Sequence, residues 1–131
     1  INEPDRPIPS GRIGGRWGLY IAIIATLISA AVGWLLGPLV FAAALVGLAF
    51  AWAYSAPPLR LKANGWVGPL ACGLTYEGLS WFTGAAVMLG AMPSVEVITI
   101  LFMYSLGAHG IMVLNDFKAV EGDRQTGLTS L

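Results

Sequence analysis

The stretch of chain between Arg16 and Arg60 contains no charged residue, and this feature restricts the fold more than any other. It is 43 residues long, about twice the roughly 20 apolar residues that cross a bilayer as a helix. Only 11% of the 131 residues are charged, whereas a soluble domain carries about 25%. The chain is therefore predicted to be an integral membrane protein.

The charge balance and the cysteine count exclude several other classes of protein. Seven basic residues balance seven acidic ones, and no basic stripe is present that would follow a nucleic-acid backbone. A single cysteine, Cys72, leaves no disulfide within the chain and no cysteine-based zinc site. The chain begins with Ile1 and lacks the ordered regions of a signal peptide. We therefore expect an internal segment of a larger polytopic protein.

Apolar runs separated by proline-containing breaks predict a bundle of four membrane-spanning helices, hence an all-α fold. The breaks fall at Gly37-Pro38, Pro57-Pro58 and Pro93, because proline cannot continue a hydrogen-bonded helix. Residues 1–131 are interpreted as one transmembrane segment, and its predicted spans are residues 17–36, 39–54, 66–92 and 95–115.

The basic residues predict how these spans are oriented. Four spans place the loops at residues 1–16, 55–65 and 116–131 on one side of the membrane. Cytoplasmic loops are enriched in lysine and arginine, so these three loops are predicted to face the cytoplasm. They hold every basic residue of the chain: Arg6, Arg12, Arg16, Arg60, Lys62, Lys118 and Arg124.

A cluster of oxygen-bearing side chains follows the last predicted span, in the run NDFKAVEGDR. It contains Asn115, Asp116, Glu121 and Asp123. Grouped carboxylates suit a hard cation such as Mg²⁺, which in proteins binds a few carboxylates together with substrate phosphates. If the helix continues, Asp116 and Asp123 lie two turns apart on one face. The alternative is a solvated loop beside the membrane, where such charges are ordinary.

The same run resembles the second aspartate-rich motif of the UbiA superfamily of intramembrane prenyltransferases. The opening INEPDRPIPSG is similar to the sequence that follows the superfamily's first aspartate motif, and Tyr54 with the Arg60 and Lys62 loop resembles its middle cytoplasmic loop. The longer run SLGAHGIMVLNDFKAVEGDRQTGLTSL most closely resembles the bacteriochlorophyll-synthesising branch. The resemblance implies a nine-helix fold in which this chain supplies helices three to six. The first-motif ligands would precede Ile1, so the segment is expected to be inactive alone.

The resemblance also implies a reaction and a set of site residues. The expected reaction is Mg²⁺-dependent transfer of a geranylgeranyl or phytyl group from its diphosphate to the propionate of bacteriochlorophyllide, in a bacterial inner or intracytoplasmic membrane. Asp116 and Asp123 are the expected catalytic carboxylates and hold the metal with Glu121. Many relatives carry an aspartate where this chain has Ala119, which places more of the metal binding on these three. The expected diphosphate-binding residues are Asn2, Arg6, Tyr54, Lys62, Asn115, Lys118 and Arg124.

Two polar residues at membrane depth are candidates for the pigment pocket. His109 precedes Asp116 by seven residues and lies about 10 Å deeper on the same helical face. Glu77 lies roughly 16 Å into the third predicted span, and ionisable groups within a membrane usually face the interior of the bundle. For each, a purely structural role stays open.

Two classes of function other than an enzyme are also open. A non-enzymatic pigment-binding or scaffold subunit of a photosynthetic assembly would suit the apolar composition and His109, and other pigment proteins would then be its partners. A transporter segment would place Glu77 in an ion path. Neither alternative accounts for carboxylates grouped beside arginines in the loops.

Overall fold

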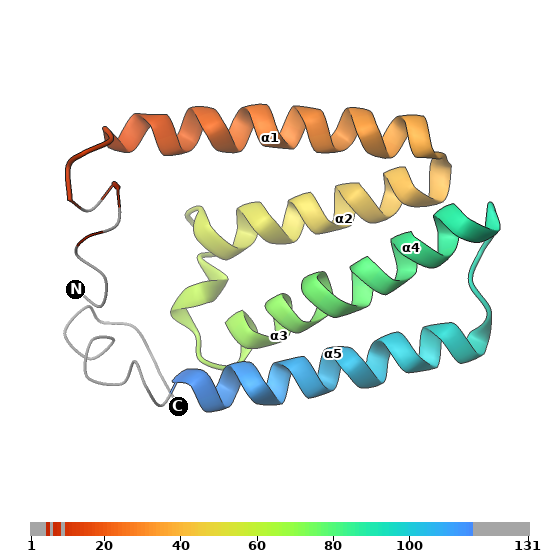
Figure 1. Cartoon of the computed structure of the whole chain (residues 1–131). Helices are drawn as coiled ribbons and strands as arrows, with labels where there is room; N and C mark the ends of the chain where they lie inside the picture. Colours follow the sequence, from red (N-terminus) through yellow and green to blue (C-terminus); the bar gives the residue numbers. More distant parts are fainter. Residues whose placement is uncertain (1–4, 6, 9, 117–131) are drawn as a thin grey trace.

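A computed structural model describes residues 5, 7, 8 and 10–116, and all regular structure in this part of the chain is helical (Figure 1). The all-α prediction is therefore confirmed. The helices are α1 (Gly15–Leu36), α2 (Pro38–Ser55), η1 (Leu61–Ala63), α3 (Val67–Gly73), η2 (Leu74–Leu79), α4 (Ser80–Leu89) and α5 (Val95–Asp116).

Three of the helices are long and apolar enough to cross a membrane, namely α1, α2 and α5 up to Asn115. The third predicted span is divided into α3, η2 and α4, which follow one another without a break in the chain and run between α2 and α5 (Figure 1). No single one of these pieces has the length of a spanning helix. The chain is an integral membrane protein, and a crossing by the α3–η2–α4 unit stays a prediction.

Two helix boundaries differ from the predicted ones for local reasons. Pro38 begins α2 instead of preceding it, because a proline at the first helical position gives up no hydrogen bond. Gly37 makes the turn before it with φ of 115°, a value that side chains disfavour. At the other break, α4 ends at Leu89 because Gly90 takes the left-handed conformation with φ of 61°, which terminates many helices.

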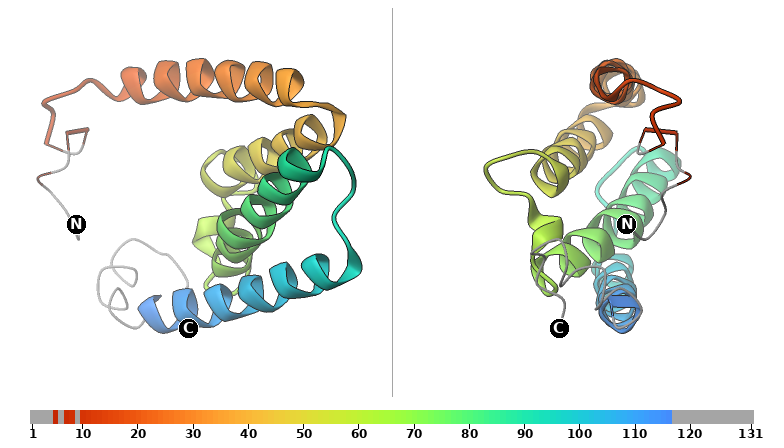
Figure 2. Two further views of the ribbon diagram at one scale, coloured as in Figure 1. Left: turned by 45° about the vertical axis from the view of Figure 1, so that its right-hand side comes forward. Right: turned by 90° about the vertical axis from the view of Figure 1, so that its left-hand side faces the viewer.

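The helices form a row in which α1 and α5 lie at opposite edges (Figures 1 and 2). Helix α1 packs on α2, where a side chain on Gly33 would place its Cβ only 3.0 Å from the Cβ of Ala44. The indole nitrogen of Trp52 also donates a 3.0 Å hydrogen bond to Thr26 Oγ1 across this contact. Close approach through small residues is the usual way in which helices associate in lipid.

The tightest contact in the described chain joins α3 and η2 to α5. A Cβ built on Gly73 would lie 2.5 Å from the carbonyl oxygen of Ser105, and one on Gly78 would lie 2.9 Å from Ser105 Oγ. Ser105 is almost fully buried, and its hydroxyl donates to the carbonyl of Leu101 at 2.7 Å. Two glycines therefore fix the distance between these helices.

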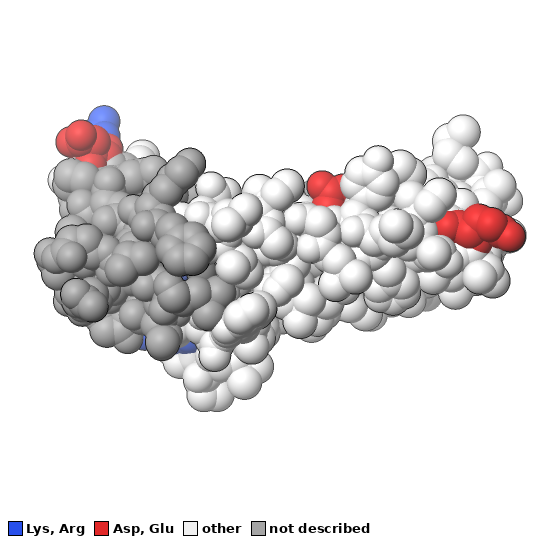
Figure 3. All heavy atoms as spheres, turned by 90° about the horizontal axis from the view of Figure 1, so that it is seen from below, with Lys and Arg blue, Asp and Glu red and all other residues white. Residues whose placement is uncertain are grey.

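One end of the row collects the polar segments that the sequence predicted to be cytoplasmic. The start of α1, the η1 loop and the end of α5 all lie at this end (Figure 1). On the face shown in Figure 3, blue atoms of lysine and arginine are visible only there. The described residues of the predicted loops therefore lie at one end, and the cytoplasmic assignment of that end stays a prediction.

Candidate functional site

A cavity of about 600 Å³ lies between α2, the α3–η2 unit, the start of α4 and α5. Tyr54, in the last turn of α2, lies on its wall, and its role in diphosphate binding stays a prediction. Gly47 and Ala51 of the same helix provide the small side chains that leave the space open. The polar side chains around the cavity are those of Tyr54, Cys72, Thr75, Tyr76 and Ser80.

The polar side chains of this cavity differ in how far they are available to a bound molecule. Thr75 Oγ1 donates to backbone carbonyls of its own helix, with oxygen distances of 2.8 Å to Ala71 and 3.2 Å to Cys72. Cys72 is buried. Tyr76 is 77% exposed, so its ring is available to a molecule in the cavity.

The wall formed by Leu74–Leu79 is a π-helix, a feature that sequence reasoning missed. Such wide turns are rare and occur frequently at functional sites. This one carries Tyr76 into the cavity wall, while the half-buried Glu77 next to it is not among the lining residues. The pigment-pocket role of Glu77 stays a prediction.

His109 lies on α5 where that helix meets the beginning of α3. Its ring packs against Trp66 with centroids 5.8 Å apart and planes tilted by 38°. Its Nδ1 atom is buried, and within the described chain it has no hydrogen-bond partner. A buried polar atom in this state costs free energy of about 1–3 kcal/mol. The arrangement therefore leaves a polar position to be satisfied by a bound group or by water.

The end of α5 connects this histidine to the predicted metal motif. The helix continues unbroken through Asn115 to Asp116, so His109 and Asp116 share one face about 10 Å apart along the axis. Asn115 is exposed, as is Lys62 in η1. Tyr54, Lys62, Asn115 and the helix end at Asp116 therefore all belong to the polar end of the molecule. The other predicted site residues lie outside the described part: Asn2, Arg6, Lys118, Glu121, Asp123 and Arg124.

The donor chemistry at this end fits a hard divalent cation. Amide and carboxylate oxygens, as in Asn115 and Asp116, are the ligands that Mg²⁺ prefers. The described residues alone hold no group of three His, Cys, Asp or Glu side chains that could bind a metal. A complete ligand set therefore requires the predicted carboxylates Glu121 and Asp123 in addition.

Asn64 is a structural residue of the site that sequence reasoning missed. Its Oδ1 accepts hydrogen bonds from the backbone N–H groups of Trp66 and Val67, both at 2.9 Å. These bonds hold the turn between the η1 helix, which carries Lys62, and the start of α3. Asparagine side chains commonly bond the backbone two residues further on in turns, so the Asn64-Gly65 pair could have been recognised as a turn in the sequence.

Comparison with known proteins adds an independent finding to this geometry. The model of the UbiA prenyltransferase family matches residues 1–131. The chain belongs to the UbiA prenyltransferase family. Membership favours the prenyltransferase interpretation over the pigment-scaffold and transporter alternatives.

Within the UbiA family, the chain is similar to several bacteriochlorophyll and chlorophyll synthases. The chain is 62% identical over its whole length to the bacteriochlorophyll synthase 33 kDa chain of Cereibacter sphaeroides and covers 43% of that protein. It is 59% identical to the corresponding chain of Rhodobacter capsulatus, covering 44% of it. The chloroplastic chlorophyll synthase of Arabidopsis thaliana is 46% identical, with 35% of its length covered. The chain thus spans less than half the length of these relatives, and no solved structure matches it.

Proposed function

We propose that this chain forms part of a membrane enzyme that transfers a geranylgeranyl or phytyl group from its diphosphate to the propionate of bacteriochlorophyllide. The observation that carries the proposal is the position of this cavity relative to the end of α5. Tyr54 on the cavity wall and the end of α5 at Asp116 lie at the same end of the molecule. The identity of 62% to a bacteriochlorophyll synthase chain supports the choice of substrates.

The prenyl donor that fits this placement has two parts of opposite character. The diphosphate is a polyanion and belongs at the polar end, whereas its isoprenoid chain is apolar and belongs in the cavity. Lys62, and with it Arg6, Lys118 and Arg124, would contact diphosphate oxygens, and Asn2, Tyr54 and Asn115 would donate hydrogen bonds to them. Positioned donors of this kind stabilise the charge that develops on a leaving group.

Asp116, Asp123 and Glu121 would hold Mg²⁺ at this end. The cation supplies neutralisation of the diphosphate charge, so that the bond from the allylic carbon to the diphosphate oxygen breaks more readily. The propionate carboxylate of the pigment then forms the new carbon–oxygen bond of the ester. This carboxylate is ionised at neutral pH, so the chain needs no strong base to activate it.

The apolar walls of the cavity have a second role in this proposal. An allylic cation reacts with water as readily as with a carboxylate, so water must be excluded while it exists. Gly47, Ala51 and Met112 provide apolar surface in the cavity wall. His109, whose buried Nδ1 has no partner within the described chain, is a candidate contact to the tetrapyrrole although it does not line this cavity, and Glu77 is a second candidate for the pigment pocket.

The proposal is tested by removing charge from the two aspartates. The assay uses a chimaera in which residues 1–131 replace the matching segment of the Cereibacter sphaeroides relative. Asp116→Asn and Asp123→Asn keep size but lose the charge that makes a good Mg²⁺ ligand. Each is expected to lower pigment esterification at saturating Mg²⁺ by a factor of about 10² or more, as the loss of leaving-group stabilisation does.

Two control variants separate this effect from general damage. Glu96→Gln removes a carboxylate from the first turn of α5, at the opposite end of that helix, and should leave turnover unchanged. Ala119→Ser adds a weak ligand atom and should also have little effect. Turnover within a factor of three of the parent chimaera in both aspartate variants would remove the metal-site argument.

A further inference from the structure

Two aromatic rings lie against each other where α4 meets α5, and the function proposed above has not used them. The rings of Trp81 and Tyr104 have centroids 5.2 Å apart and planes tilted by 33°. Trp81 is 43% exposed and Tyr104 is 55% exposed. The two rings together present an aromatic surface that the described chain leaves about half uncovered.

This pair lies at an unusual depth for its residue types. Tryptophan and tyrosine gather at the two membrane interfaces, because each carries a polar N–H or O–H group beside its apolar ring. Tyr104 instead lies eleven residues before Asn115, about 16 Å along α5 at 1.5 Å per residue. Rings that carry polar groups at this depth fit a flat ligand with polar substituents.

The side of α5 that carries Tyr104 continues to the polar end of the molecule. Tyr104, Ala108, Ile111 and Asn115 recur at spacings of four, three and four residues, which places them on one helical face. Ala108 is half-buried, and Ile111 and Asn115 are exposed. A molecule that lies on the aromatic pair can therefore extend along this face of α5 as far as Asn115.

Glu77 lies close to the aromatic pair along the chain. It precedes Trp81 by four residues, about one helical turn, and it is half-buried. An ionisable side chain at membrane depth usually faces the interior of a bundle and marks a functional site. The spacing therefore places a candidate residue of the pigment pocket on the same side of this unit as Trp81.

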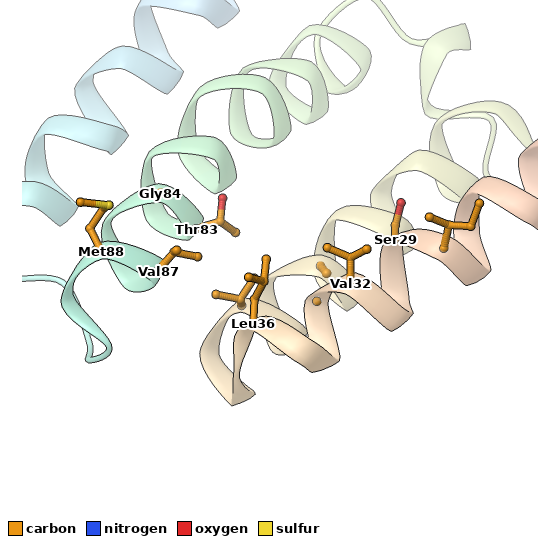
Figure 4. Close-up of a pocket in the computed structure, with 11 residues that line it drawn as sticks. Ser29, Val32, Leu36, Thr83, Gly84, Val87 and Met88 are labelled. Atoms are coloured by element: carbon orange, nitrogen blue, oxygen red, sulfur yellow. The ribbon is translucent and has the colours of Figure 1, made fainter.

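The neighbouring depression between α1, α2 and α4 offers no comparable surface (Figure 4). Val32 and Leu36 of α1 and Val87 and Met88 of α4 are among its lining residues, and none of the residues that line it is aromatic. Of these two places on α4, only the Trp81–Tyr104 pair offers the face of a ring to a ligand.

We propose that Trp81 and Tyr104 form the surface on which the tetrapyrrole ring of the acceptor stacks, with its propionate directed along α5 toward Asn115. This inference rests on the proposed function and adds to it the position and orientation of the pigment. Aromatic rings stack with their centroids offset and about 4.5–7 Å apart, and a tetrapyrrole has a large flat face for this contact. The N–H of Trp81 and the O–H of Tyr104 can also donate to carbonyl groups on the pigment.

The length of the pigment agrees with this placement. A tetrapyrrole macrocycle is roughly 10 Å across and its propionate arm adds about 4 Å, for covalent bonds of about 1.5 Å. This length is close to the roughly 16 Å that separate Tyr104 from Asn115 along α5. A pigment stacked on the pair would therefore bring its carboxylate to the polar end, where the prenyl diphosphate is proposed to lie. An acceptor with a single six-membered ring is too short to make both contacts.

Leucine in place of either ring tests the contact in the chimaera. Trp81→Leu and Tyr104→Leu keep an apolar side chain but remove the ring. Each should raise KM for bacteriochlorophyllide at least fivefold and leave KM for the prenyl diphosphate within twofold of the parent value. Trp81→Phe keeps a ring and should stay within threefold of the parent for both substrates. A merely structural role would lower kcat or Tm without separating the two KM values.

Trp34→Leu is the matched control for the loss of an exposed tryptophan. Trp34 is 70% exposed and also has an aromatic neighbour, but its ring meets Phe41 edge-on at 89°. Its replacement should leave both KM values unchanged. An unchanged pigment KM in Trp81→Leu and Tyr104→Leu, or an equal rise in both KM values, would overturn the stacking surface and would indicate that lipid or another helix covers the pair.

A labelling measurement keeps the proposal testable should both leucine variants fail to fold. In a cysteine-free background, bacteriochlorophyllide should protect Ala108→Cys from a maleimide at least fivefold, and geranylgeranyl diphosphate should protect it less than twofold. Gly107→Cys is the control, because its Cβ would meet no atom within 4 Å and points about 100° away around α5, so it should stay unprotected. Equal protection of both cysteines by the pigment, or protection of neither, would overturn the proposal.

The parent chimaera separates this proposal from the function on which it rests. If it esterifies no bacteriochlorophyllide, the proposed function itself fails. Normal esterification together with an unchanged pigment KM in both leucine variants overturns the stacking surface alone.

Discussion

The contact between Gly73 and Ser105 offers a sharp test of how the α3–η2–α4 unit is held against α5. The added Cβ in Gly73→Ala would lie 2.5 Å from the Ser105 carbonyl oxygen and 3.1 Å from the His109 nitrogen. Both are backbone atoms, so neither can rotate away as the end of a flexible side chain would. The variant therefore has to push two helices apart.

The size of the effect follows from two opposing terms. Overfilling a packed contact costs typically about 1–3 kcal/mol, while replacing glycine by alanine within a helix gains about 0.5–1 kcal/mol. Gly107→Ala has the second term alone, because its Cβ meets no atom within 4 Å. The difference between the two variants therefore isolates the clash, and Gly73→Ala should be less stable than Gly107→Ala by about 1–3 kcal/mol.

Thermal unfolding of the detergent-solubilised chimaera measures this difference. The relative is roughly 300 residues long, since 131 residues cover 43% of it, and at that size each kcal/mol corresponds to about 1.6 °C in Tm, so Gly73→Ala should melt about 2–5 °C below Gly107→Ala. Gly78→Ala should fall between them, because its Cβ meets the side-chain oxygen of Ser105 at 2.9 Å. Combining Gly78→Ala with Ser105→Ala should recover part of the loss. Equal Tm values for Gly73→Ala and Gly107→Ala would refute the close packing of these helices.

Two further predictions concern topology and pigment binding. Single cysteines at Ser10, Asn64 and Thr126 should react with a membrane-impermeant thiol reagent only from the cytoplasmic face, and labelling of Asn64 from the other face would contradict the four-span arrangement. His109→Phe should lower kcat/KM for bacteriochlorophyllide at least fivefold while leaving the Kd of the prenyl diphosphate nearly unchanged, as measured by steady-state kinetics and calorimetry. Equal losses in both, or in neither, would return His109 to a structural role.

Much of the fold could be predicted from the sequence because lipid imposes a simple requirement on it. A charge-free run such as residues 17–59 has to be helical, and Gly37, Pro38 and Pro93 mark where it turns. The helix bounds agree with the predicted spans within a few residues at most ends. The polar end was also predictable, because every lysine and arginine lies outside the predicted spans.

The π-helix and the cavities could not be predicted in the same way. A π turn at Leu74–Leu79 depends on how that segment meets its neighbours, and Gly73, just before it, and Gly78, within it, both lie against Ser105 of α5. The cavity depends on small residues that come from separate helices, such as Gly47 of α2 and Ser80 of α4, which both line it. The periodicity of one helix shows which of its residues share a face, but it does not show which other helix packs against that face.

Helix α5 carries both the packing contact with the two glycines and the predicted site residues. Ser105, held by Gly73 and Gly78, lies one turn before His109, and the same helix continues to Asp116. Because a helix is rigid over this length, the depth at which Ser105 is fixed also fixes the position of Asp116 along α5 relative to the cavity that Tyr54 borders. A displacement of α5 by the Gly73→Ala clash would therefore move the proposed metal motif relative to Tyr54. The packing of two glycines on one serine is in this way a condition for the proposed alignment of Asp116 with this cavity.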